Sequence, residues 1–112
     1  MVDRICFVEL PASAIAPAKA FYAAVFGFKM TDFGPAYACT MSGDVDLGLQ
    51  ADPQEATRAP LPVIQVESLE AAMDAVLGAG GVVTRATFSF PGGRRFHFRD
   101  PAGNELAAMQ LG

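Results

Sequence analysis

The stretch AFYAAVFG at residues 20–27 recurs in outline as AAMDAVLG at residues 71–78. Both copies carry apolar residues at helical spacing and end in glycine, so each predicts a helix. A strand-like run precedes each copy and further strand-like runs follow it. The sequence therefore predicts a doubled strand–helix–strands unit, an arrangement in which two similar halves build a pocket together.

Alternating runs rich in β-formers supply the strands around both helices. In the first half we expect strands at residues 4–10, 28–33, 36–41 and 45–50. In the second half we expect them at residues 61–66, 82–90, 94–99 and 105–110. The predicted fold class is α+β, with two tandem β-α-β-β-β modules.

A chain of 112 residues normally forms one domain, so both modules are expected to share residues 1–112. Residues 51–59 are polar and lack periodicity. We expect this segment to link module 1, about residues 3–50, to module 2, about residues 60–111.

Two details of the helices are also predicted. Ser13 and Ser68 each precede a helical run and are the expected N-caps. Phe21 and Val25 lie one helical turn apart on one face, so Phe21 is expected to belong to the core beneath the first helix.

Composition excludes several classes of protein. Apolar residues make up 52% of the chain and charged residues only 18%, so disorder is not expected. The net charge of −4 argues against a nucleic-acid partner. No run is long enough for a membrane span, and Cys6 and Cys39 lack metal-type spacing, so we expect reduced thiols and a cytoplasmic location.

Two motifs lie in a fixed order around the repeat: Phe21-Tyr22…Phe26-Gly27 in the first helix and Asp100-Pro101-Ala102-Gly103-Asn104 before the last strand. With the doubled module, they make the chain similar to the vicinal oxygen chelate superfamily, the group of glyoxalase I, bleomycin-resistance proteins and extradiol dioxygenases. The resemblance covers essentially the whole chain. It implies a mixed sheet curled around a central cavity, helices outside, and a homodimer.

In metal-dependent members of that superfamily, the first strand of each module supplies one ligand, usually His, and the last strand another, usually Glu. The resemblance places these four positions at Phe7, Gly48, Leu61 and Ala107. None of the four binds a divalent ion, which needs imidazole, carboxylate or thiolate groups. Glu9 and Asp46 lie nearby, but one or two carboxylates make a poor site. We therefore expect neither a metal site nor another cofactor.

Strand alternation predicts which side chains face the cavity if Phe7 does. On the seventh strand, Phe96 and Phe98 are expected to cover the helix, which leaves the residues between and beside them for the cavity. The resulting cleft is apolar with a few polar groups, as is usual for a small-molecule site. The candidate ligand-binding residues are Phe7, Glu9, Gln65, His97, Arg99 and Met109.

Each polar candidate also has a structural interpretation. Glu9 interrupts an apolar strand and is either an anchor for a cationic or hydrogen-bond-donating ligand or an internal ion pair with Arg95 or Arg99. His97, the one histidine of the chain, is either a general base or a packed strand residue. Gln65 either contacts the ligand or makes a structural hydrogen bond, and Arg99 also suits bracing of the following turn.

The leading functional prediction is a metal-independent protein that binds an unidentified small molecule, of the kind that sequesters aromatic or cationic compounds. The first alternative is a metal-dependent lyase, isomerase or dioxygenase whose ligands are displaced from the four positions above. The second alternative is a dimeric interaction module without a small ligand. The identity of the ligand is beyond what the residues indicate.

Overall fold

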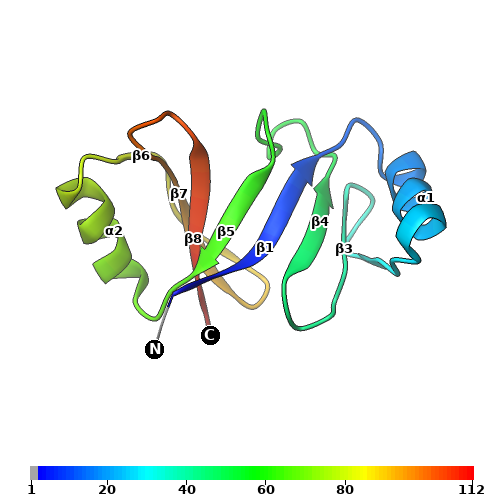
Figure 1. Cartoon of the computed structure of the whole chain (residues 1–112), viewed down its shortest axis with the longest axis horizontal. Helices are drawn as coiled ribbons and strands as arrows, with labels where there is room; N and C mark the ends of the chain where they lie inside the picture. Colours follow the sequence, from blue (N-terminus) through cyan, green and yellow to red (C-terminus); the bar gives the residue numbers. More distant parts are fainter. Residues whose placement is uncertain (1–2) are drawn as a thin grey trace. The chain divides into compact units, whose positions relative to one another are not determined.

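A computed structural model of the chain describes residues 3–112 (Figure 1). The first half contains β1 (Arg4–Pro11), α1 (Ile15–Phe26), β2 (Thr31–Asp32), β3 (Tyr37–Cys39) and β4 (Asp46–Gln50). The second half contains β5 (Leu61–Gln65), α2 (Leu69–Gly78), β6 (Val82–Phe90), β7 (Gly93–Arg99) and β8 (Glu105–Leu111). The fold class is α+β, as predicted, with the β-α-β-β-β order present twice.

The described residues form two compact units. One unit is Phe7–Leu61, and the other combines residues 3–6 with residues 62–112. In the first, the strand order is β2-β3-β4-β1, and in the second it is β6-β7-β8-β5. In both, the first strand pairs with the last in parallel, and the remaining pairs are antiparallel. The two halves therefore share one topology. Within the described residues, no helix has the length and apolar character needed to cross a membrane.

Helix α2 packs on its sheet through a compact apolar core. Leu69 and Phe96 are completely covered, and they form a cluster with Val66 and Ala108. Phe98 packs against the edge of this cluster, so Phe96 and Phe98 cover the helix side of β7, as predicted. The stripe of apolar residues along α2 thus supplies the energy that holds the helix in place.

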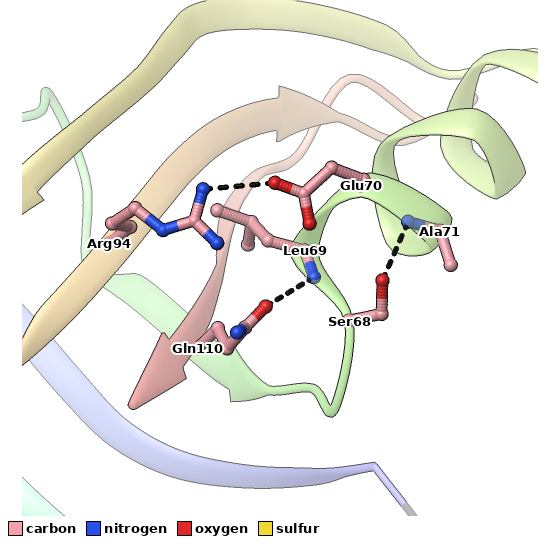
Figure 2. A network of polar contacts seen from close by, with 6 residues as sticks. All are labelled: Ser68, Leu69, Glu70, Ala71, Arg94 and Gln110. Atoms are coloured by element: carbon pink, nitrogen blue, oxygen red, sulfur yellow. Dashed lines mark hydrogen bonds and ion pairs between the residues drawn. The ribbon is translucent and has the colours of Figure 1, made fainter. Parts of the chain in front are cut away.

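The N-terminus of α2 is capped by two side chains. Ser68 Oγ accepts a hydrogen bond from the Ala71 amide at 3.2 Å, which confirms the predicted cap. Gln110, from β8, accepts a second bond from the Leu69 amide through Oε1 at 2.8 Å (Figure 2). These bonds satisfy amide groups that a helix start leaves without intrahelical partners.

Helix α1 differs from the prediction in its cap and in its packing. Ala14, not Ser13, is the N-cap residue, and no side chain caps this helix. Phe21 is 57% exposed and Val25 is 53% exposed, so the prediction that Phe21 belongs to the core was wrong. No residue of α1 is buried, although most of its residues are apolar.

The shortness of β2 follows from the way α1 ends. Gly27 takes a left-handed φ of 70° and its amide bonds to Ala23 O. The Phe28 amide bonds back to Tyr22 O at 3.3 Å, so the chain stays tied to the helix beyond its end. Strand β2 consequently contains only Thr31 and Asp32 of the predicted residues 28–33.

The two serines offer a matched test of helix capping. Replacing Ser68 by alanine should lower the free energy of unfolding by about 1 kcal/mol, because the Ala71 amide loses its acceptor. Replacing Ser13 by alanine should change it little, since Ser13 caps nothing. Urea denaturation measures both values. Equal losses in the two variants would contradict this account of α1 and α2.

Candidate functional site

Pairing of β1 with β4 places a set of functional side chains on one face of the first unit. Phe7 is registered with Asp46 and Glu9 with Gly48, while Cys39 of β3 lies opposite Gly48 on its other side. Because paired residues point to the same face of a sheet, these side chains gather there. Phe7 and Glu9 thus share a face, as the alternation predicts.

Gly48 lies beneath the side chains of that face. A Cβ atom built on Gly48 would lie 2.5 Å from Cζ of Phe7 and 2.7 Å from the Tyr37 hydroxyl oxygen. The Phe7 ring therefore occupies the space that any side chain at Gly48 would need. A glycine is required here for close packing, although its backbone is not left-handed.

Glu9 is the buried acidic group of the same face. Its side chain is 1% exposed, and Oε1 accepts a hydrogen bond from the Tyr37 hydroxyl at 3.2 Å. Burial of a carboxylate is costly unless hydrogen bonds or charges compensate it. The phenol of Tyr37 is a partner that the sequence analysis did not foresee, because β3 had to be registered against β4 to bring it there.

Asp46 serves the turn between β3 and β4. Its carboxylate accepts hydrogen bonds from the Thr40 hydroxyl at 2.7 Å, the Ser42 amide at 2.8 Å and the Gly43 amide at 3.2 Å. Burial acts to raise the pKa of Asp46, but these bonds from Ser42, Thr40 and Gly43 outweigh it and leave the pKa lowered. Burial, with the nearby Asp46 charge, raises the pKa of the Cys39 thiol.

In the second unit, the face of β7 opposite α2 carries the polar candidates. His97 is registered with Ala107, and Arg95 with Met109. Gln65 of β5 is also registered with Met109. Gln65, His97 and Met109 therefore share one face, as the sequence analysis predicted.

His97 lies in a buried polar and aromatic cluster. His97 is 2% exposed, and its Nδ1 lies 3.5 Å from Glu105 Oε2. The same carboxylate oxygen accepts a hydrogen bond from the Thr84 hydroxyl at 2.7 Å. The Phe88 ring centroid lies 5.7 Å from that of His97 and 3.6 Å from the Arg85 guanidinium carbon. Irregular pairing between β6 and β7 sets the positions of Arg85 and Phe88.

Glu105 is the partner of His97 that the sequence analysis missed. His97 and Glu105 lie on consecutive strands, and the antiparallel register of β7 and β8, in which Arg99 faces Glu105, brings the two side chains together. The available signal is strand alternation, which places His97 and Glu105 on one face once β7 and β8 are paired.

The remaining two candidates make contacts within the protein. Arg99 Nη1 donates to the carbonyl oxygen of Gly103 at 3.1 Å, so this side chain braces the turn before β8. In that turn Gly103 has a φ of 90°, and the Asp100 amide bonds to Asn104 O. Met109 Sδ accepts a hydrogen bond from the Cys6 thiol at 3.5 Å.

The four positions at which the family places metal ligands do not fit a metal ion. Phe7, Leu61 and Ala107 offer no donor atoms, and the Phe7 ring fills the space over Gly48. Among residues 3–112, no three His, Cys, Asp or Glu side chains are grouped so as to hold a metal. Asp46 lies near Gly48 on β4, but its carboxylate oxygens accept hydrogen bonds from the turn between β3 and β4.

Comparison with known protein families identifies the fold. The family model described as Glyoxalase/Bleomycin resistance protein/Dioxygenase superfamily matches residues 4–108. The chain belongs to this superfamily. No curated protein sequence matches it significantly.

Solved structures share the superfamily fold at low sequence identity. A hypothetical protein from Bacillus halodurans C-125 has a TM-score of 0.79 at 14% identity, covering 100% of this chain and 96% of its own. Methylmalonyl-CoA epimerase from Mycobacterium tuberculosis has a TM-score of 0.74 at 13% identity, and the match covers 96% of this chain and 87% of the epimerase chain. The Mn(II)-bound glyoxalase from Novosphingobium aromaticivorans has a TM-score of 0.70 at 20% identity, and the match covers 97% of this chain and 40% of the glyoxalase chain.

The packing of Phe7 on Gly48 is open to a double-mutant test. Gly48→Ala should lower the free energy of unfolding by about 1–3 kcal/mol, because the new methyl group forces the Phe7 ring and the Tyr37 hydroxyl to move. Phe7→Ala in the same chain should recover part of that loss, because it vacates the space. Urea denaturation of both single variants and the double variant measures the coupling. Additive losses would show that Phe7 and Gly48 are not in conflict for the same volume.

Proposed function

We propose that this superfamily member binds a small aromatic or cationic compound without the help of a metal ion. The observation that carries the proposal is the buried Glu9 carboxylate beside the Phe7 ring, on the sheet face where the family places its ligands. A negative charge next to an aromatic face suits an organic cation, which gains both an ion pair and a cation–π contact.

The packing of Gly48 supports metal independence. A family ligand on β4 would need a carboxylate at this position, and the Phe7 ring already occupies the space of its first carbon. Restoring the ligand would take more than one substitution, because Phe7 would have to give way as well. The aromatic ring thus offers a ligand an apolar surface at a position where relatives with metals use a donor atom.

Binding is tested by calorimetric titration with small cationic aromatic compounds, for example phenyltrimethylammonium and 1-naphthylmethylammonium. Glu9→Gln should weaken binding by about tenfold or more, because the buried charge that pairs with the cation is lost. Asp74→Asn, on the exposed surface of α2, removes the same net charge and should leave the affinity unchanged. Absence of binding by the entire panel, or equal weakening in both variants, would contradict the proposal.

A second candidate function is enzymatic, and the His97–Glu105 pair favours it. An imidazole held near a carboxylate can accept and return a proton, and such pairs often tighten only when a substrate is bound. The structural neighbours include a methylmalonyl-CoA epimerase and a Mn(II)-bound glyoxalase. A metal-dependent lyase, isomerase or dioxygenase activity is therefore the alternative, with His97 as its acid–base residue.

Metal analysis separates the two candidates. Protein purified without chelator should contain far less than one equivalent of nickel, zinc, manganese or iron if it is the proposed binding protein. One equivalent of metal, lost together with activity in Glu9→Gln or His97→Gln, would establish the metal-dependent enzyme instead. Asp74→Asn again serves as the control for a nonspecific loss of metal.

Two further expectations belong with the proposed function. Self-association as a homodimer is supported by the exposed apolar side chains of α1, which include Phe21, Val25 and Phe26. A cytoplasmic location is supported by Cys6 and Cys39, which are both buried and both in the thiol form.

A further inference from the structure

A groove of about 600 Å³ lies in the first unit, between the segment that follows α1 and the hairpin of β3 and β4. Its apolar lining includes Val8, Phe28, Met41, Val45 and Leu47. This volume falls in the range of small-molecule sites, which are typically a few hundred to about 1,000 Å³. The groove is therefore large enough to hold an organic ligand.

The groove is distinct from the proposed site around Glu9. Val8 follows Phe7 and precedes Glu9 on β1, and it is registered with Leu47 of β4. Because successive residues of a strand point to opposite faces, Val8 and Leu47 lie on the other side of the sheet from Phe7 and Glu9. A ligand in the groove would not contact the buried carboxylate.

The wall of the groove leaves large apolar side chains in contact with water. Phe28 is 39% exposed, Val45 51% and Met41 66%. The Phe28 ring is held in place by Tyr22 and Phe26, whose ring centroids lie 6.4 Å and 5.4 Å away. A flexible hydrocarbon chain laid along this wall would remove its apolar surface from water, which is the main source of affinity for such ligands.

The two charged side chains that line the groove differ in whether they already have partners. Asp46 lines it, but the Asp46 carboxylate is already bound by Thr40, Ser42 and Gly43. Lys29 lines it as well, and within residues 3–112 its ammonium group pairs with no carboxylate. The other lysine, Lys19, differs because it pairs with Asp32 at 2.7 Å.

We propose that this groove binds a free, single-chain amphipathic carboxylate. The hydrocarbon chain lies along Phe28, Met41 and Val45, over the floor made by Val8 and Leu47, and the carboxylate pairs with the Lys29 ammonium group. The site needs no metal and no second protein chain.

Calorimetric titration of the full chain with decanoate, below the concentration at which it forms micelles, tests the proposal. Decanoate should bind saturably at one site, more tightly than decanol. Lys29→Met should weaken decanoate by about fivefold and remove its advantage over decanol, because the ion pair is lost and the stem is kept. Lys19→Met is the matched control and should bind decanoate like the unaltered chain.

A second variant addresses the apolar wall. Val45→Asp should weaken decanoate by more than about tenfold, since it puts a carboxylate against the hydrocarbon chain. Val45 is half exposed, so the variant should fold, and its thermal unfolding measured by circular dichroism checks this. Glu9→Gln should leave decanoate binding unchanged, because Glu9 lies on the other face of the sheet. The test of decanoate binding is therefore independent of the test of the proposed cation site.

Four outcomes would overturn the proposal. The first is no saturable heat with monomeric decanoate, and the second is equal affinity in Lys29→Met and Lys19→Met. The third is a dimer, measured by sedimentation equilibrium, that Val45→Asp converts to a monomer while decanoate fails to bind. That result would assign the groove to a second copy of the chain. Binding to phosphatidylglycerol vesicles without binding of monomeric decanoate would likewise count against a free ligand.

Discussion

In each module the first strand pairs in parallel with the last, β1 with β4 and β5 with β8. Parallel pairing requires a crossover, and the helix and two intervening strands provide it. The register that results decides which side chains meet. It brings Glu9 beside Gly48 in one module and places Gln65 and His97 on the face of Met109 and Ala107 in the other. The arrangement of the candidate side chains on both sheet faces depends on that pairing.

The Phe7 ring fills the space above Gly48 that a side chain at this position would need. An aromatic ring and a residue without a side chain complement each other, and a metal ligand at Gly48 would require the Phe7 ring to move. Glu9 remains buried close by, with Tyr37 as a hydrogen-bond donor. In the proposed function, this face recognises its ligand by charge and aromatic contact.

The two modules repeat in topology but differ in how their helices are stabilised. Helix α2 has one apolar stripe, a serine cap and a core built on Phe96 and Leu69. Helix α1 lacks a side-chain cap and has no buried residue, and its aromatic side chains stack on each other instead. This difference leaves apolar surface available on the first module, where both the proposed groove and the proposed self-association would use it.

The sequence alone determined the α+β class, the repeated module and most element positions, because hydrophobic periodicity and turn residues act over short distances. The Ser68 cap, the turn at Gly103 and the helix-facing side of Phe96 all follow from neighbours within a few residues. Tertiary structure decided the rest. The exposure of Phe21 depends on tertiary packing, and the pairing of Tyr37 with Glu9 and of Glu105 with His97 depends on strand register, which local patterns do not record.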